Sequence, residues 1–243
     1  MSKTFKIGCS GYYYAAWRNT FYPMGLPASQ WLLHYSTVFN TVELNGTFYR
    51  VPTLSTLKKY ARQTPADFVF TVKMNKHITH ILRLKQAREK ILEFCDLMME
   101  GLGEKLHNIL YQLPPSFVYN QANLENVLHN IPASYGSVVE FRNASWWNKE
   151  VVTALQAHNL SFCNTDYAGI EQTYIRTSAI FYTRKHGLPK LFKSVYTTSE
   201  LKEFATSIPP GAADVYVYFN NTWYDGAYKN ASELIKMLES TND

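Results

Sequence analysis

Three segments of the chain end in two polar residues separated by one position. These pairs are Glu43 with Asn45, Glu140 with Arg142, and Arg184 with His186. Residues two apart in a β-strand point to the same side, so each pair would present its side chains together. Burying a charge at the end of an apolar strand is costly unless the charge has a partner. The spacing therefore predicts places where charges meet, either in a functional site or in structural ion pairs.

Lys73 ends the apolar run from Phe68 to Val72, which has the composition of a strand buried on both faces. A lysine there could bind an anion, act as a base with a lowered pKa, or form a Schiff base. It could equally extend its ammonium group into water. Asp166 and His80 are further candidates for proton transfer. The alternatives are a loop start for Asp166 and a surface or helix-entry contact for His80.

These charges favour an anionic substrate, with carboxylates left for proton transfer. The predicted catalytic residues are Glu43, Glu140, Asp166 and His80. The predicted anion ligands are Lys73, Arg142 and Arg184. The other predicted substrate-binding residues follow strand-like runs or lie in the loops beyond them: Asn45, Tyr49, Arg50, Arg83, Gln112, Trp146, His186, Asn220 and Asn221. Gly187 and Gly226 would let backbone amides approach a phosphate near the last two strands.

No metal or cofactor is predicted. The histidines and carboxylates above contain no His-x-His or His-x-x-x-His pair of the kind that holds zinc. Cys9, Cys95 and Cys163 lie far apart. An odd, scattered set of cysteines indicates reduced thiols, and we expect a cytoplasmic protein.

Strand-like runs alternate with helical patterns along the 243 residues. The predicted strands are Phe5–Cys9, Thr41–Leu44, Phe68–Lys73, Asn108–Gln112, Ser137–Phe141, Ser161–Thr165, Ile180–Arg184 and Asp214–Phe219. The predicted helices are Ser29–Phe39, Ser55–Gln63, Lys85–Gly101, Leu124–Asn130, Asn148–His158, Ser199–Ser207 and Ala227–Leu238. Helices between successive strands require a parallel sheet. Eight strands favour a single-domain (β/α)8 TIM-type barrel, with an open doubly wound sheet as the rival. In a barrel the polar strand ends would converge on one face.

Composition limits the partners. The formal net charge of +5 permits an anionic ligand but falls short of the basic bias of a dedicated nucleic-acid binder. An aromatic-rich loop at Ser10–Ala28 and the segment Tyr167–Ala179 would both lie on the catalytic face of a barrel. They would serve either binding or closure of the barrel top. No apolar run approaches the roughly 20 residues that span a membrane, and the oligomeric state is left open.

The chain also resembles a known family over nearly its whole length. The carrying motifs are Gly8-Cys9-Ser10-Gly11, Thr41-Val42-Glu43-Leu44-Asn45, Gln112-Leu113-Pro114-Pro115, Val139-Glu140-Phe141-Arg142, Arg184-Lys185-His186-Gly187 and Tyr218-Phe219-Asn220-Asn221. By these motifs the chain resembles the YecE-like family, domain of unknown function 72. The resemblance implies a (β/α) barrel but supplies no reaction.

Three functions follow, in decreasing order of support. The first is a metal-independent enzyme that acts on a small phosphorylated or otherwise anionic molecule, sugar-like compounds included. The second is a nucleic-acid-binding protein or phosphodiesterase, by analogy of fold with endonuclease-IV-like barrels. The third is a non-catalytic protein whose polar barrel end is structural. Cavity-free ion pairs at the barrel end would favour the third.

Overall fold

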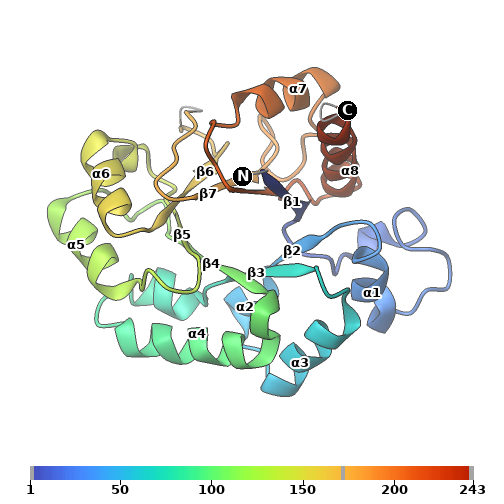
Figure 1. Cartoon of the computed structure of the whole chain (residues 1–243), viewed down its shortest axis with the longest axis horizontal. Coiled ribbons are helices and arrows are strands. Elements are labelled where there is room, and N and C mark those ends of the chain that lie inside the picture. The colour runs from blue at the N-terminus through green and yellow to red at the C-terminus, as the bar shows by residue number, and fades with distance from the viewer. Residues whose placement is uncertain (1–2, 171–172, 241–243) are drawn as a thin grey trace.

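The computed structural model describes residues 3–170 and 173–240. Eight parallel strands form one sheet (Figure 1). Their bounds are β1 Thr4–Cys9, β2 Thr41–Leu44, β3 Val69–Lys73, β4 Leu106–Gln112, β5 Ser137–Glu140, β6 Ser161–Thr165, β7 Ile180–Lys185 and β8 Asp214–Phe219. Each predicted strand is present, with ends that differ by at most two residues.

The sheet closes into a barrel. Each strand pairs with its neighbour in the order β1-β8-β7-β6-β5-β4-β3-β2. The seam between β1 and β2 is joined by a parallel bridge between Ser10 and Glu43. This closure confirms the predicted barrel over the open sheet. It also brings the carboxyl ends of all eight strands to one end of the barrel interior, here called the barrel mouth.

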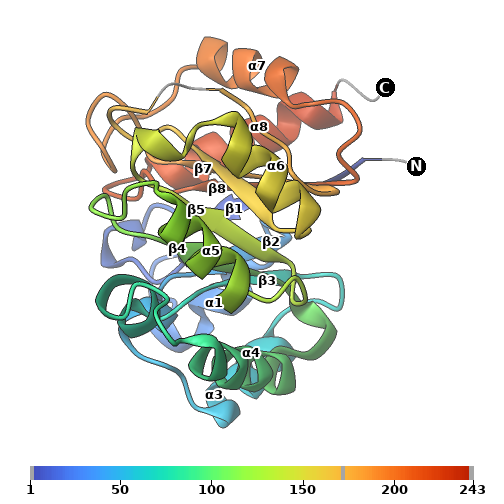
Figure 2. The ribbon, with the colours of Figure 1, turned by 90° about the vertical axis from the view of Figure 1, so that its left-hand side faces the viewer.

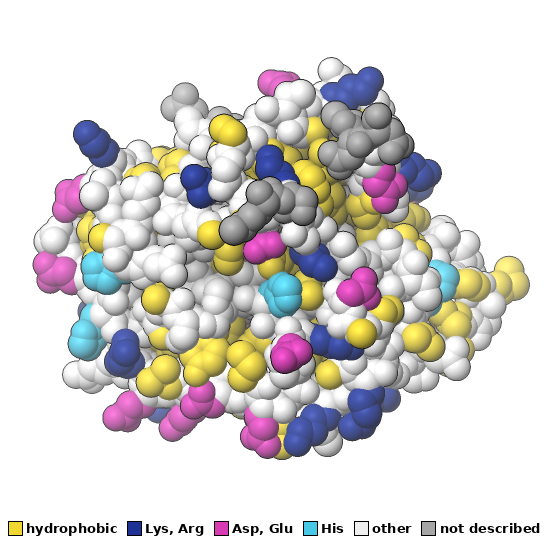
Figure 3. Space-filling view, viewed as in Figure 1, with side chains coloured by type: hydrophobic (Ala, Val, Ile, Leu, Met, Phe, Trp, Pro, Cys, Tyr) yellow, Lys and Arg dark blue, Asp and Glu magenta, His cyan; other side chains and the backbone are white. Residues whose placement is uncertain are grey.

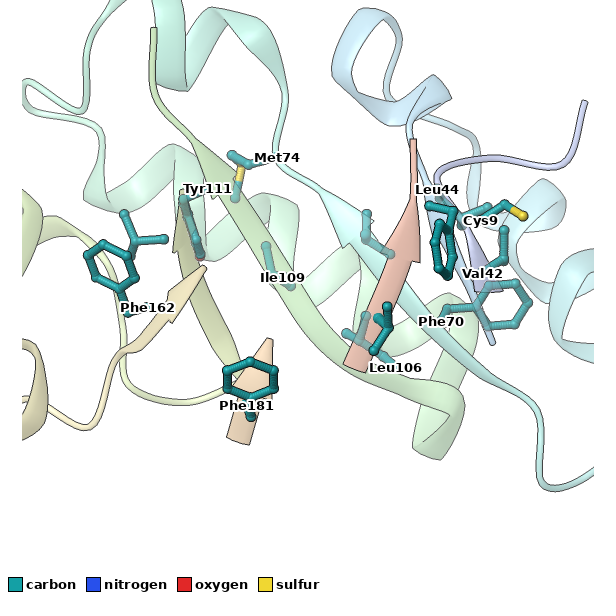
Figure 4. Packing of buried hydrophobic residues seen from close by; sticks show 14 of the residues in the cluster. Cys9, Val42, Leu44, Phe70, Met74, Leu106, Ile109, Tyr111, Phe162 and Phe181 are labelled. Atoms are coloured by element: carbon teal, nitrogen blue, oxygen red, sulfur yellow. The ribbon is translucent and has the colours of Figure 1, made fainter. Parts of the chain in front are cut away.

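Strand alternation divides the buried side chains into two layers. Inward-facing residues include Leu110, Tyr182 and Tyr218, which form a small cluster inside the barrel. Outward-facing residues belong to the larger core between strands and helices. Figure 4 shows part of this outer core, where residues such as Val42 and Ile109 come from different strands. A strand residue two positions from an inward one is therefore also inward.

Helices surround the strands (Figure 1). Their bounds are α1 Trp31–Tyr35, α2 Gly46–Tyr49, α3 Leu54–Gln63, α4 Arg88–Leu102, α5 Gln121–Asn130, α6 Lys149–Ala157, α7 Thr198–Ser207 and α8 Gly226–Glu239. In the side view of Figure 2, β1 begins and α8 ends on the same side of the barrel. None of the helices in the described ranges is long and apolar enough to cross a membrane.

Several helix ends differ from the sequence-based prediction. α3 begins at Leu54, one residue before the predicted start at Ser55, and the hydroxyl of the capping residue Thr53 accepts a hydrogen bond from the Thr56 amide. α4 begins three residues later than predicted, because Arg83, Leu84 and Gln86 adopt positive φ angles that a right-handed helix excludes. α6 begins at Lys149, one residue after the predicted start, and the side chain of Asn148 caps it by accepting a hydrogen bond from the Val151 amide.

Two short helical segments were not predicted. α2 follows directly after β2, and a π-helical turn, His77–Ile81, follows β3. α1 is also shorter than predicted, because the hydroxyls of Ser36 and Thr37 bond to backbone carbonyls of the last helical turn. All three differences lie on the connections that follow β1, β2 and β3. These helical segments are too short for their periodicity to be detected in the sequence.

Candidate functional site at the barrel mouth

Arg184 lies between two carboxylates at the centre of the mouth. Its Nη2 donates to Glu43 Oε1 at 2.7 Å, and its Nε lies 3.0 Å from Glu43 Oε2. Its Nη1 donates to Glu140 Oε2 at 2.7 Å. All three side chains are at most 1% exposed. The planar guanidinium uses both of its edges, a geometry that lysine could not reproduce.

Further donors complete the two carboxylates. The Tyr182 hydroxyl donates to Glu43 Oε2 at 2.7 Å. The Arg142 Nε donates to Glu140 Oε1 at 2.9 Å. Each carboxylate thus accepts hydrogen bonds from Arg184 and from a second side chain, which is Tyr182 for Glu43 and Arg142 for Glu140. We call Glu43, Glu140, Arg142, Tyr182 and Arg184 the central network.

The environment keeps Glu140 and Arg184 ionised. Burial alone would raise the pKa of Glu140, but Arg142 and Arg184 hold this pKa well below its usual range. Burial alone would lower the pKa of Arg184, but the Glu140 and Glu43 carboxylates raise it well above its usual range. Glu140 is therefore a carboxylate at any ordinary pH and cannot donate a proton as a general acid.

His186 borders the central network in its neutral form. Burial lowers the pKa of this completely buried histidine to about 4, although the hydrogen bond to Glu140 acts to raise it. The Asn220 amide nitrogen donates to Nδ1 at 2.8 Å, so the ring proton resides on Nε2. Nε2 faces Glu140 Oε1 at 3.3 Å. His186 thus acts as a neutral donor to a carboxylate.

Lys73 lies on the other side of the mouth and has no such partners. Its ammonium nitrogen stands 4.2 Å from the centre of the Phe48 ring. It makes no hydrogen bond or ion pair with any side chain in the ranges 3–170 and 173–240. The pKa of Lys73 is lowered to about 7, chiefly by burial and also by the neighbouring Arg184 and Arg142 charges. The Glu140 and Glu43 carboxylates oppose this shift. Near neutral pH a large fraction of Lys73 is therefore an uncharged amine.

His80 and Gln112 lie beside Lys73. Burial and the nearby charge of Lys73 lower the pKa of His80 to about 4. Gln112 Nε2 lies 3.4 Å from His80 Nε2, and Thr79 Oγ1 lies 2.9 Å from His80 Nδ1. Because the amide can only donate, the neutral ring carries its proton on Nδ1. The histidine, like Lys73, is available here as a polar group without charge.

Asp166 occupies a different environment from the other predicted catalytic residues. It lies one residue beyond β6 in the outward-facing phase, and its carboxylate accepts from the His186 amide at 2.5 Å and from the Tyr196 hydroxyl. Tyr196 also accepts from the Gly187 amide at 2.6 Å. These hydrogen bonds connect Asp166 to the segment that follows β7. Asp166 is therefore placed to position His186 from behind, and the Gly187 amide that was expected to approach a phosphate is already bonded.

Three predicted substrate-binding residues are bonded to protein groups outside the central network. Trp146 is fully buried between Phe117 and Phe141, with its indole N–H bonded to the Phe117 carbonyl at 2.6 Å, so no ligand could reach it. Arg83 is exposed and donates to Ser116 at 3.2 Å. Asn221 donates to the Ser194 carbonyl and to Asn230 and ties the last two loops together. Trp146 lies beyond the end of β5, in a short 3-10 turn, and its ring is part of the outer core.

Asn45, Tyr49 and Arg50 lie together, but in a cleft beside the mouth. This cleft, of about 920 Å³, is bounded by the loop after β1 and by α2 and α3. Lys73, His80, Gln112, Arg142 and Asn220 do not line it. The structure therefore divides the remaining predicted substrate-binding residues into two groups, at the mouth and in the cleft, that the sequence does not distinguish.

Sequence reasoning missed two members of the site. Tyr182 binds Glu43, and Ser10 lies 3.5 Å from Arg184 Nη2 and pairs with Glu43 across the barrel seam. A signal for Tyr182 was present, because it precedes Arg184 by two positions and so shares its inward phase. Ser10 directly follows the first strand, so its place at a strand end was visible in the sequence, but its contacts with Glu43 and Arg184 were not.

The carboxylates of the mouth are occupied by arginine. Over the described ranges, no three His, Cys, Asp or Glu residues are grouped so as to hold a metal ion. Glu43 and Glu140, the two inward carboxylates, each face Arg184.

Comparison with known proteins assigns the family. The family model described as protein of unknown function DUF72 matches residues 6–243. The UPF0759 protein YunF of Bacillus subtilis (strain 168) is 24% identical, over 91% of each chain. The crystal structure of a DUF72 family protein from Thermotoga maritima MSB8 superposes with a TM-score of 0.87 at 31% identity, covering 97% of this chain and 99% of that one. A DUF72 family protein from Enterococcus faecalis V583 shares the fold with a TM-score of 0.79 at 18% identity, covering 97% of this chain and 96% of that one. This chain belongs to the DUF72 family.

Proposed function

We propose that the protein is an enzyme that binds a small phosphorylated or otherwise anionic molecule, sugar-like compounds included, at the barrel mouth. The proposal rests chiefly on one observation, the absence of a carboxylate partner for Lys73 within the described residues. The central network holds two arginines and two carboxylates and is neutral as a whole. In its protonated form, Lys73 adds a positive charge that this network does not balance. An anion beside Lys73 would supply the missing charge.

The remaining groups suggest how the anion would be held. The side chain of Arg142 is 11% exposed, whereas that of Arg184 is 1% exposed, so Arg142 is the arginine that a ligand can reach. The Arg142 guanidinium also stacks over the Tyr167 ring at 4.6 Å, which fixes its plane. Arg142 would bind the anion, and Lys73 would face the reacting part of the molecule.

Lys73 is also the best candidate for proton transfer. A general base works best when its pKa lies near the operating pH, and the pKa of Lys73 is about 7. Glu140 is a weaker base because its pKa is held well below the usual range. Glu43 and Glu140 would then orient Arg184 and Arg142, with His80 beside Lys73 as a neutral hydrogen-bonding group.

Binding of simple anions tests the proposal. We would measure the thermal midpoint of the wild type and of Lys73→Met in inorganic phosphate, sulfate, glucose 6-phosphate and ribose 5-phosphate. The expected result is stabilisation of the wild type that Lys73→Met and Arg142→Gln both reduce. Lys90→Gln on the exposed surface of α4 is the matched control and should respond like the wild type. Equal responses in Lys73→Met and the wild type would refute the anion site.

A non-catalytic role is the second candidate, and the saturated central network favours it. Arg184, Glu43 and Glu140 satisfy one another through direct hydrogen bonds and are at most 1% exposed. A network of this kind needs no ligand to explain it. Lys73 distinguishes the two candidates, because its ammonium group lies at the mouth beside Phe48 and has no carboxylate partner among the described residues, so an anion could pair with it there.

Nucleic-acid binding receives less support. In the aromatic loop after β1, Trp17 is fully buried and Tyr22 is 1% exposed, so neither can stack on a base. On the face seen in Figure 3, basic and acidic side chains are interspersed, and no single sign of charge dominates. Retention on single-stranded DNA or RNA at low salt that weakens steeply with added salt would reverse this order.

A further inference from the structure

The cleft beside the mouth has the dimensions of a ligand site. Its volume of about 920 Å³ falls in the range of pockets that enclose small molecules. One wall is the loop after β1, and the other is formed by α2 and α3. Gly11 lines the cleft and directly follows Ser10 of the Ser10–Glu43 bridge. Asn45 also lines the cleft and lies two residues after Glu43. The cleft therefore opens next to the mouth but is not part of it.

The charges around the cleft have one sign. Its lining contains Arg50 and Lys59 and no aspartate or glutamate. Both basic side chains are exposed, and neither makes an ion pair with any carboxylate of the described residues. Two unpaired cations on one rim attract an anionic group.

Tyrosine rings provide the apolar surface. Tyr13 is 64% exposed and Tyr49 is 72% exposed, which is unusual for large aromatic side chains that line a concave surface. Tyr13 packs against Trp31 with ring centres 4.9 Å apart, and Tyr12 packs edge to face on Tyr60 at 6.3 Å. Tyr12 is packed among other rings, whereas Tyr13 and Tyr49 keep most of their surface exposed. Such rings offer platforms on which a planar ligand can stack.

Asn45 adds an unsatisfied polar group at the inner wall. Its side-chain oxygen is buried without a hydrogen-bond partner, and its amide nitrogen donates to no atom of the described residues. A buried acceptor without a partner costs about 1–3 kcal/mol. Rotation of the amide towards the cleft would let a ligand satisfy both of its polar atoms.

We infer that this cleft binds a small anionic molecule that carries a planar ring, of which a mononucleotide is the simplest example. The ring would stack on the exposed tyrosines, with its polar edge on Asn45, and the anionic group would contact Arg50 and Lys59. The inference does not depend on the proposed function, because Lys73 and Arg142 do not line the cleft.

Three probes separate the two halves of this ligand. AMP carries both ring and phosphate, adenosine lacks the phosphate, and ribose 5-phosphate lacks the base. Calorimetric titration is done with Lys73→Met, so that the anion site proposed at the mouth does not contribute. We expect AMP to bind at least about tenfold more tightly than either fragment, because each contact is worth roughly 1–3 kcal/mol. Binding of ribose 5-phosphate as tight as that of AMP, or no binding of AMP up to millimolar concentration, would overturn the inference.

Two surface variants locate the site. Tyr13→Leu and Arg50→Gln should each weaken AMP binding by about tenfold, since both side chains are exposed and their loss leaves the core intact. Lys90→Gln is the control and should leave AMP binding unchanged. AMP affinity that neither variant alters would place the nucleotide elsewhere and refute the assignment. Tighter binding of a short oligonucleotide than of AMP would also refute a ligand of mononucleotide size.

Discussion

Charged side chains are buried on both sides of the barrel mouth, but they are paired with opposite charges on only one side. On one side, Arg184 is shared by Glu43 and Glu140 in a network that leaves no carboxylate without a donor. On the other side, Lys73 is 9% exposed and faces an aromatic ring rather than a carboxylate. A buried charge that is paired can be tolerated, whereas an unpaired one costs free energy. The comparison separates groups that hold the barrel end together from a group that the fold retains at a cost.

The largest effect is expected from breaking the paired side. Arg184→Met would leave Glu43 and Glu140 buried without their shared cation, and removal of one partner from a buried ion pair costs about 3–5 kcal/mol. We expect a loss of this size in the free energy of unfolding, measured by urea denaturation at pH 7. Arg62→Met, on the exposed face of α3, is the matched control. A loss below about 1 kcal/mol would mean that the network contributes little.

Replacement of the unpaired Lys73 should have the opposite effect on the free energy of unfolding. Lys73→Met should stabilise the protein at pH 6, because it removes an ammonium group that the folded state disfavours. One unit of pKa shift corresponds to about 1.4 kcal/mol, so we expect a gain of roughly 1–4 kcal/mol. Urea denaturation of wild type and variant measures it. A destabilised variant would show that Lys73 contributes to stability and would remove the contrast.

The pH dependence of this gain follows from the direction of the shift. The pKa of Lys73 is about 7 when folded against 10.5 as its ordinary value, so the unfolded chain binds more protons between these values. Wild-type stability relative to Lys73→Met should therefore rise with pH from about 7 to 10.5. The advantage of the variant is then largest below pH 7 and smallest above 10.5. A difference that is constant over this window would contradict the lowered pKa.

The smallest of these effects tests how completely the paired side is satisfied. Tyr182→Phe removes one hydroxyl that donates to Glu43 and leaves Arg184 in place. A hydrogen bond to a charged group contributes about 1.5–3 kcal/mol, so we expect a loss near the lower end of that range. Tyr49→Phe, on a 72% exposed ring, is the control for loss of a hydroxyl. Equal stability of the two variants would show that Arg184 alone suffices for Glu43.

Much of this architecture was predictable because strand periodicity is a local property. The two-residue spacing of Glu140 with Arg142 and of Arg184 with His186 correctly predicted that each pair shares a side, since side-chain direction depends only on the residue's own strand. The same rule, applied to Asn164 and Asp166, would have assigned Asp166 to the outer layer. Helix ends were predicted less well, as at α4, because positive φ angles at Arg83 and Leu84 leave no mark in the pattern of apolar residues.

The pairing of these charges could not be predicted from local sequence patterns. Glu43 and Arg184 are 141 positions apart, and only closure of β1 against β2 and the stagger of the strands bring their side chains within 2.7 Å. Composition and spacing alone thus predict eight parallel strands with charged residues at their ends, whereas the closure of the barrel is decided by the structure. Which charges neutralise each other, which lysine is left without a partner, and which aromatic residues open onto a cleft depend on long-range contacts, because electrostatic and packing energies are set by distances in space.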